Sequence, residues 1–472
     1  QLQYVTIGGT KAGKVTHYQL HAIQDSGGFA DMGTILAPFM TRPMSSGVYA
    51  IPNIECRTTS VVTNTTPIVA YRGAGRPEAT AAIERAMDLF ALEIGKDAAE
   101  VRRMNLIPKF LEPHTTVVGQ TYDVGDYETA LDKALDAADY KALRAEQAKR
   151  RASGDAKQLG IGVSVYVEIT GGVGNGESAK VEVLEDGRAV VYTGTSPHGQ
   201  GHDTAWSMLV QEQTGIPMDR IELVWGDTDL VPVGTGTMGS RSLQQGGNAV
   251  FQVAGTLAEK AKSVAARLLE VSEADVVLDK DRGAFHVVGT PAVTKTWADL
   301  AVAEKSTGGL LHDEVINVSG ATFPFGAHIA VVEVDTETGR VKHLRQVACD
   351  DAGKVLNPML LDGQIHGGIA QGVAQALLEE VLYDADGNPT TSNLADYGFI
   401  SAAELPNVEV IHMETPTPVN AIGAKGIGES GTIGSTPAIQ SAVVDAVSHL
   451  GVKHIEMPCT AERVWRAIQA AQ

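Results

Sequence analysis

The sequence predicts a mixed α+β fold, and three observations indicate it. Apolar and polar residues alternate in several short segments, as in half-buried strands, whereas other segments carry apolar residues at helical spacing. The two kinds of segment do not follow one another in the regular order of a doubly wound parallel sheet. Segments 276–288 and 330–348 place turn residues between strand-forming runs, which predicts β-hairpins. With 472 residues the chain is long enough for two domains or more.

The first third of the chain begins with strands and ends with helices. Residues 1–70 alternate apolar and polar positions and predict strands. A glycine-rich turn precedes Pro77, which can occupy the first position of a helix. Segment 127–157 is charged, rich in alanine and predicted to be helical. Its polar end predicts a domain boundary near residue 155, so we expect one domain at 1–155 and another at 156–472.

A new strand system begins after this boundary with the apolar run LGIGVSVYVEIT. Helical spacing then predicts further helices at residues 202–214, 248–271, 358–381, 435–450 and 459–471. No segment repeats at a fixed period, so a repeat protein is not expected.

Composition excludes several classes of function. The formal net charge is −20, which argues against a nucleic-acid-binding surface. Three cysteines, Cys56, Cys349 and Cys459, are too few and too scattered for a disulfide framework or a four-cysteine iron–sulfur cluster, so a cytoplasmic location is expected. The sequence holds no apolar run of about 18 residues, so no membrane span is expected.

Four glycine-rich polar loops stand out as candidate binding sites. They are AYRGAGRPEA (70–79), TSPHGQGHDT (195–204), GTGTMGSRS (234–242) and NAIGAKGIGESGTIGSTPAI (420–439). Loops of this kind expose successive backbone N–H groups, which bind anions, although glycine is also common in turns that bind nothing. The last loop places a single carboxylate, Glu429, among glycines, as for a catalytic group held at short range or a solvated loop residue.

Charged residues in two of these loops suggest anion binding. Arg72 and Arg76 flank a glycine turn and form a fork that suits phosphate or carboxylate, with surface ion pairing as the alternative. Arg241 lies among hydroxyl residues, which favours an anion site at that position.

Two familiar motifs are matched only in part. GTGTMG fits the dinucleotide-binding pattern G-x-G-x-x-G, but no apolar helix follows it directly, which disfavours a nicotinamide site. His198 and His202 have the spacing of zinc ligands on a helix, but two of the residues between them are glycines and the usual glutamate is missing.

Taken in order along the chain, five segments resemble one known family. AYRGAGRPEA, HGQGHDT, GTGTMGSRS, NPMLLDGQIHGGIAQGVAQALLEE and GAKGIGESGTIGSTPAI are similar to the molybdenum-binding large subunit of the xanthine oxidase family of molybdenum hydroxylases. The resemblance runs from near residue 1 to near the C-terminus. It implies two elongated mixed α/β domains of the molybdenum cofactor-binding type, with 1–155 as the C-terminal part of the first and 156–472 as the second.

The resemblance also implies a cofactor and a catalytic residue. The bacterial three-subunit members carry molybdenum in molybdopterin cytosine dinucleotide, and their K-G-x-G-E glutamate acts as the catalytic base beside the metal. That residue is Glu429 here. No side chain is expected to ligate the metal itself. The residues that match the cofactor-lining segments are Arg72, Gly73, Ala74, Gln200, Gly201, His202, Thr237, Gly239, Ser240, Arg241, Ser242, Cys349, Asp350, Asn357, Gln364, Lys425, Gly426 and Gly428. A buried structural thiol is the alternative for Cys349.

This chain departs from the family pattern in two ways. Copper-dependent carbon monoxide dehydrogenases have a cysteine in the form A-Y-R-C-S-F-R, whereas Gly73 stands at that position here, which disfavours copper. The family's N-terminal part, with its G-G-G-F-G loop, is not in this sequence, so we expect another chain or segment to supply it.

The resulting hypothesis is a hydroxylase that oxidises an aldehyde or a nitrogen heteroaromatic with oxygen from water. We expect an iron–sulfur small subunit with [2Fe-2S] clusters and an FAD-binding medium subunit as partners, in a dimer of heteromers. Three alternatives stay open. They are a carbon monoxide dehydrogenase-like protein without the copper-ligand cysteine, a cofactor-binding component without turnover, and a nicotinamide dehydrogenase.

Overall fold

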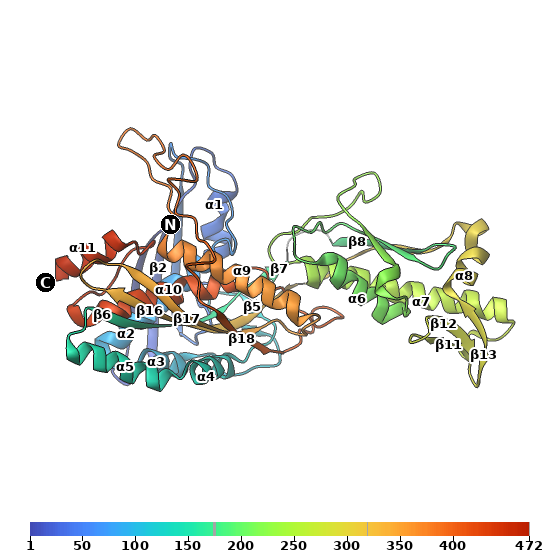
Figure 1. Cartoon of the computed structure of the whole chain (residues 1–472), viewed down its shortest axis with the longest axis horizontal. Helices are drawn as coiled ribbons and strands as arrows, with labels where there is room; N and C mark the ends of the chain where they lie inside the picture. The colour runs from blue at the N-terminus through green and yellow to red at the C-terminus, as the bar shows by residue number, and fades with distance from the viewer. Residues whose placement is uncertain (173–175, 319, 472) are drawn as a thin grey trace.

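The computed structural model describes residues 1–172, 176–318 and 320–471. The molecule is elongated, with a larger lobe that contains both termini and a smaller lobe built from the middle of the chain (Figure 1). Helices and sheets are mixed in both lobes, so the predicted α+β class is confirmed. In the described residues, no helix is long and apolar enough to cross a membrane.

A four-stranded sheet organises the larger lobe. Its strands, in spatial order, are β18 (Val408–Met413), β17 (Val341–Asp351), β16 (Phe325–Asp335) and β6 (Lys157–Val167). β16 lies antiparallel to both β6 and β17, and β18 lies parallel to β17. Because successive side chains of a strand point to opposite faces, odd-numbered residues of β6 and β16 enter one hydrophobic core and even-numbered residues of β16 enter another.

Helices cover both faces of this sheet. On one face lie α9 (Pro358–Leu377), α10 (Ser430–Val447) and α11 (Ala461–Ala471). The core on the other face contains residues of α2 (Arg76–Ile94), α3 (Ala98–Asn105) and α4 (Tyr127–Ala138), and α5 (Tyr140–Ser153) runs beside β6. α10 approaches β6 closely because β6 contributes glycines there. A Cβ on Gly162 would lie 1.9 Å from the carbonyl oxygen of Ala438.

The N-terminal segment forms a second, three-stranded sheet of order β1–β2–β3. Its strands are β1 (Leu2–Gly9), β2 (Val15–Asp25) and β3 (Asn53–Val61). The prediction of strands throughout 1–70 was wrong between β2 and β3, where the chain forms α1 (Met32–Leu36), the π-helical turn η1 (Ala37–Thr41) and further turns. The buried residues there, Gly33, Leu36, Ala37, Thr41 and Met44, recur at the spacing of a helix. Short strand pairs are β4 (His114–Thr115) with β5 (Thr121–Tyr122) and β7 (Thr170–Gly171) with β15 (Ala321–Thr322).

The smaller lobe has its own sheet and its own hydrophobic core. The strands in spatial order are β10 (Ile221–Val224), β9 (Ala189–Thr193), β8 (Glu177–Val183) and β14 (Leu310–Ile316). α6 (His202–Thr214), α7 (Asn248–Leu269) and α8 (Trp297–Glu304) pack in this lobe with a three-stranded sheet of β11 (Val276–Asp279), β12 (Ala284–Val287) and β13 (Thr290–Thr296). Short helical turns in this part of the chain are η2 (Met218–Arg220), η3 (Ser242–Gly247), η4 (Glu273–Asp275) and η5 (Lys305–Thr307). In the larger lobe, η6 (Ser448–Leu450) directly follows α10.

Most predicted elements after residue 155 are confirmed. Both hairpins form, as β11–β12 and β16–β17, and α6 and α7 lie at the predicted residues. Three helices differ from prediction. α9 ends at Leu377, four residues before its predicted end. The helix at 127–157 breaks at Asp139, which adopts a left-handed φ of 50°. α10 begins five residues earlier than predicted, at Ser430, because glycines that lower helix propensity are needed for packing. A Cβ on Gly431 would lie 2.6 Å from the carbonyl oxygen of Ile365.

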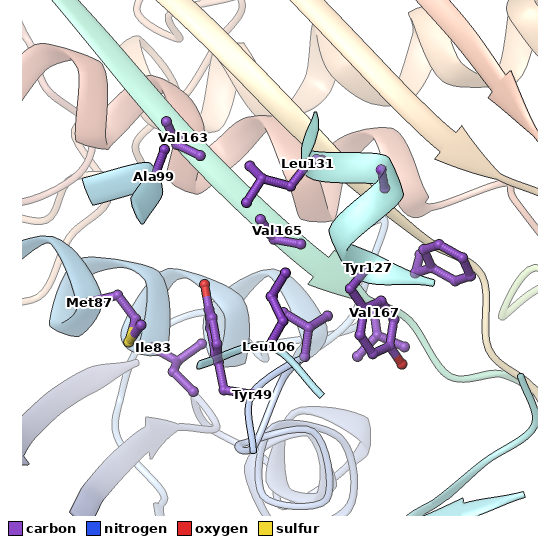
Figure 2. Packing of buried hydrophobic residues seen from close by; sticks show 14 of the residues in the cluster. Tyr49, Ile83, Met87, Ala99, Leu106, Tyr127, Leu131, Val163, Val165 and Val167 are labelled. Atoms are coloured by element: carbon purple, nitrogen blue, oxygen red, sulfur yellow. The ribbon is translucent and has the colours of Figure 1, made fainter. Parts of the chain in front are cut away.

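Residues from both sides of position 155 share one core in the larger lobe. Figure 2 shows Ile83 and Met87 of α2 and Leu131 of α4 near Val163 and Val165 of β6. The division into 1–155 and 156–472 stays a prediction. What the structure describes is a boundary between lobes near the start of β8 and the end of β14 (Figure 1).

Candidate functional site

Glu429 lies directly before α10, where three residues from two segments of the chain, 70–79 and 234–242, hold its carboxylate. The backbone N–H of Gly73 donates to Oε1 at 2.9 Å. Arg76 Nη2 and the Ser240 hydroxyl donate to Oε2 at 2.6 and 2.9 Å. The position at a helix N-terminus also favours a negative charge. The sequence therefore folds so that a lone loop carboxylate is fixed in orientation rather than solvated.

The pKa of Glu429 is lowered from its ordinary value. Burial opposes ionisation of the carboxyl group, but the charge of Arg76 and the hydrogen bonds from Gly73 and Ser240 outweigh it. The side chain is 13% exposed. Glu429 is thus an ionised acceptor at neutral pH, which is the protonation state that a general base needs.

Arg72 links two of the predicted loops, 70–79 and 420–439, to α9. Its Nε donates to the carbonyl of Gly428 at 2.6 Å, and its Nη2 lies 3.2 Å from both the carbonyl and the side-chain oxygen of Gln364. The turn that carries Arg72 contains Gly73 and Ala74, both with positive φ (104° and 42°). The structure therefore brings the 70–79 loop, the start of α9 and the segment before α10 together.

The 234–242 loop reaches the same place through Ser240. A Cβ on Gly426 would lie 1.9 Å from the carbonyl oxygen of Ser240, so this approach requires glycine. The same loop also contacts the segment after β6, where the backbone N–H of Gly171 donates to the carbonyl of Gly239 at 3.0 Å. Ser242 donates to Thr237 at 3.1 Å within the loop.

Arg241 is buried and already paired. Its guanidinium forms an ion pair with Glu177 and donates to the carbonyl of Gly236 at 3.0 Å and to Gln245 at 2.7 Å. The anion that the sequence led us to expect at Arg241 is, in this structure, the Glu177 carboxylate. Its part in cofactor binding stays a prediction.

The 195–204 loop lies beside the start of α9. Gly201 precedes α6, and a Cβ on it would lie 2.6 Å from the Leu360 side chain. His202 is buried and stacks on Trp206 with ring centroids 4.6 Å apart. The Gln200 side chain accepts from the backbone N–H of His198 and turns back on its own loop. Among the described residues, no cluster of side chains could hold a metal ion, which leaves the zinc interpretation of His198 and His202 without support.

Four predicted residues have their side chains engaged away from Glu429. Cys349 is buried in the core of the sheet, and burial raises its pKa to about 12, which fits a structural thiol. Asp350 accepts from Tyr166 at 2.6 Å and lies 3.0 Å from His328. The other two are Lys425 and Asn357. Lys425 Nζ lies 3.0 Å from Asp351 at the end of β17, and Asn357 caps the N-terminus of α9.

Two residues at the centre of the site were not predicted as site residues. Arg76 was interpreted only as part of an arginine fork, and Glu168 was not singled out. Arg76 is buried, and its Nη2 lies 3.1 Å from Glu168 and 2.6 Å from Glu429. The available signal was a lone carboxylate at the end of the apolar strand SVYVEITGG, because a charge in that position must find a partner.

The loops also leave room and donors for a large polar cofactor. A Cβ at Gly199, Gly236 or Gly239 would meet no atom within 4 Å, so these backbones are open to a ligand. In the described part of the chain, buried His202 Nδ1 and Gln244 Nε2 have no hydrogen-bond partner. Since buried polar atoms are normally paired, these residues fit a polar group bound at the loops. GTGTMG, by contrast, follows no strand directly, as β10 ends at Val224, which disfavours a nicotinamide site.

Comparisons with known proteins agree with this description. Two molybdopterin cofactor-binding domain models match residues 1–106 and 133–406. The carbon monoxide dehydrogenase large chain of Hydrogenophaga pseudoflava is 39% identical over 98% of this chain and 60% of its own length. The nicotine 6-hydroxylase large subunit of Paenarthrobacter nicotinovorans is 33% identical, with 98% and 59% covered. The chain therefore spans about 60% of the length of these relatives.

Solved structures give the same result. A Cu,Mo-CO dehydrogenase superposes with a TM-score of 0.92 at 35% identity, covering 99% of this chain and 62% of the other. Quinoline 2-oxidoreductase from Pseudomonas putida 86 superposes with a TM-score of 0.91 at 32% identity, again covering 99% and 62%. The matched domain models cover more than half of the residues, and the chain belongs to the molybdopterin cofactor-binding family of molybdenum hydroxylase large subunits.

Proposed function

We propose that this chain forms the molybdenum-binding part of a hydroxylase that oxidises an aldehyde or an N-heteroaromatic C–H carbon with oxygen from water. The observation that carries the proposal is the fixed, ionised carboxylate of Glu429, held by Gly73 and Arg76 of one loop and by Ser240 of another. In this proposal Glu429 is the general base. Its pKa, lowered chiefly by Arg76 against the effect of burial, keeps it ready to accept a proton.

The loops around Glu429 would hold molybdopterin cytosine dinucleotide. The open glycine backbones at 199 and 239 supply N–H groups for the phosphates, and Gln200 and Thr237 supply side-chain donors beside them, with Ser242 hydrogen-bonded to Thr237. When bound, the cofactor supplies the two-electron redox chemistry. The chain's own residues orient it. Arg72 holds its loop against Gly428 and Gln364, and Glu429 Oε accepts the proton.

Copper-dependent oxidation of carbon monoxide is disfavoured despite the similarity to carbon monoxide dehydrogenases. Gly73 stands where a copper-ligand cysteine is expected, with a φ of 104°, and a Cβ there would lie 2.4 Å from Pro77 Cγ. A cysteine cannot occupy this turn without displacing the loop. A carbon monoxide dehydrogenase-like activity without copper is the second candidate, because a relative at 39% identity has that name. Turnover of carbon monoxide by the holoenzyme, compared with its turnover of aldehydes and heteroaromatics, separates the two, and copper in the holoenzyme would contradict both.

Electrons would pass to partner chains. We propose an iron–sulfur small subunit with [2Fe-2S] clusters, an FAD-binding medium subunit and a further chain or segment for the part of the relatives that this chain does not span, assembled as a dimer of heteromers in the cytoplasm. Exposed apolar side chains such as Phe29, Phe39 and Phe399 are available for such contacts.

Glu429→Gln in the holoenzyme tests the base. Turnover of aldehydes and heteroaromatics should fall by about 100- to 10,000-fold, while molybdenum content and released CMP stay at the wild-type level. Glu409→Gln, which removes a partly exposed partner of Arg345, is the matched control and should leave turnover unchanged. Unchanged turnover in Glu429→Gln with molybdenum bound would show that Glu429 is not the base, whereas a wild type that binds molybdenum without any turnover would indicate a cofactor-binding component.

A further inference from the structure

Two carboxylates meet at the candidate site, and the proposed function uses only one of them. Oε1 of Glu168 lies 3.0 Å from the Ser240 hydroxyl and 3.1 Å from Arg76 Nη2. The same hydroxyl and the same nitrogen lie 2.9 and 2.6 Å from Oε2 of Glu429. Ser240 and Arg76 therefore bridge the two carboxyl groups.

The number of hydrogens at this bridge limits its protonation state. Nη2 of Arg76 carries two hydrogens and can donate to both carboxylates, but the Ser240 hydroxyl carries one and can donate to only one. With both carboxylates ionised, the Ser240 oxygen would face one of them with a lone pair. A proton on one carboxyl group removes the conflict, because that O–H donates to Ser240 Oγ while Ser240 donates to the other carboxylate.

The backbone conformation at Ser240 indicates that the surrounding structure fixes the position of its hydroxyl group. Ser240 has a left-handed φ of 54°, which is uncommon for a residue with a side chain. Its carbonyl packs so closely on Gly426 that a Cβ there would lie 1.9 Å away. The surrounding structure thus holds the hydroxyl between the two carboxyl groups.

Burial distinguishes the two carboxyl groups. The Glu168 side chain is fully buried, whereas that of Glu429 is partly exposed. Burial raises the pKa of Glu168 to about 7, although Arg76 lowers it, and the nearby charge of Glu429 adds to the rise. The pKa of Glu429 is lowered, so the shared proton belongs on Glu168.

We propose that Glu168 and Glu429 form a proton-sharing carboxylate pair bridged by the Ser240 hydroxyl, in which Glu168 stores the proton. A proton on Glu429 Oε2 passes to Ser240 Oγ as the Ser240 hydrogen passes to Glu168 Oε1. This leaves Glu429 ionised, Glu168 neutral and the hydroxyl restored, and no electron moves. The use of this transfer in turnover rests on the proposed role of Glu429 as base. Glu168 is then a positioning residue that acts through Glu429.

The charged and titratable groups around Glu168 come from three directions. Arg76 and, in the turn before it, Arg72 face it from the start of α2, and Glu429 faces it from the start of α10. On its own side of the sheet is Tyr166, which donates to Asp350 of β17 at 2.6 Å. The positive charges of the two arginines stabilise the ionised form of either carboxyl group. The pair can therefore carry one negative charge or two near neutral pH.

Infrared spectroscopy of this protein as a function of pH tests the pair without substrate. The wild type should show the C=O band of a protonated carboxyl group that disappears as the pH rises through about 7. Glu168→Gln should remove that band. Glu177→Gln, which alters another fully buried glutamate paired with an arginine, should leave it. A band that persists in Glu168→Gln overturns the proposal.

A second pair of variants tests the bridge, and also serves if Glu168→Gln does not fold. Ser240→Ala should lower the midpoint of the band by about one pH unit, because the singly protonated pair loses two hydrogen bonds and the ionised pair only one. Ser242→Ala removes a hydroxyl of the same loop that bonds Thr237 instead and should leave the midpoint unchanged. Equal midpoints in Ser240→Ala and the wild type overturn the bridge.

Holoenzyme kinetics then separate the two proposals. In the wild type we expect the turnover rate to change with pH around 7, where Glu168 ionises. Glu168→Gln should still bind molybdenum but lose this change in turnover rate. Because the infrared band does not require turnover, its absence would overturn the pair and leave the Glu429 test standing. Full turnover in Glu429→Gln, with the infrared band present in the wild type and absent from Glu168→Gln, would overturn the base and leave the pair.

Discussion

The amide of Gly73 shows how one residue can fix the geometry of the site. It donates to Glu429 at 2.9 Å from a turn in which Gly73 has a φ of 104°. Other residues adopt that conformation at a cost, and a side chain here would also overlap Pro77. The carboxylate orientation therefore depends on the absence of a side chain one turn before α2.

Gly73→Ala should destabilise the protein more than Gly95→Ala. Both substitutions place alanine at positive φ, which costs about 1–2 kcal/mol, but Gly95 has no atom within 4 Å of the new Cβ. The overlap with Pro77 should add about 1–3 kcal/mol at position 73. Urea denaturation of the two variants measures the difference. Equal losses would mean that the turn relaxes without cost.

At the scale of an element, α10 connects the sheet to the site. It is buried along nearly its whole length and lies against the glycines of β6, and its N-terminus carries Glu429. Glycine normally weakens a strand, so Gly160 and Gly162 are explained by the helix that packs on them. The position of the carboxylate thus depends on contacts as far along α10 as Ala442 and Ala446.

Gly162→Ala should therefore destabilise the protein although alanine suits a strand better than glycine. The new Cβ would lie 1.9 Å from the Ala438 carbonyl oxygen and push α10 away from the sheet, at a cost of about 3 kcal/mol. Gly363→Ala in α9, where a Cβ meets nothing within 4 Å, should instead stabilise by about 0.5–1 kcal/mol. Thermal or urea unfolding of both variants measures the contrast, and a neutral Gly162→Ala would contradict it.

At the scale of the whole molecule, the site lies where the two lobes meet. Glu429, Glu168 and Arg76 belong to the larger lobe, and Ser240 is in a loop between β10 and α7 of the smaller lobe. Each lobe has its own core. The bridge between the carboxylates is therefore also a contact between lobes.

Separate cores predict separate unfolding transitions. Leu257→Ala in α7 and Ile329→Ala in β16 each remove a fully buried side chain, at a cost of about 2–5 kcal/mol. We expect calorimetry to show two transitions, with each variant lowering a different one. A single transition that both variants lower equally would show that the lobes unfold together.

Much of the fold and part of the site could be predicted from the sequence, for local reasons. The hairpins and α6 and α7 follow from turn residues and periodicity. Glu429 and Ser240 were singled out because their loops resemble a family. Glu168 was missed since a single charge after an apolar strand has no local pattern. Its partners Arg76 and Ser240 lie 92 and 72 residues away in the sequence.

By itself, the sequence determined the fold class, most helices after residue 155 and the family, because periodicity and glycine-rich motifs are local properties of the chain. Tertiary structure alone decided that 32–41 is helical and that Arg241 pairs with Glu177, and it alone placed two carboxylates on one serine hydroxyl. Burial and long-range pairing set these outcomes, since the free energy of a charge depends on what surrounds it in space and not on its neighbours in sequence.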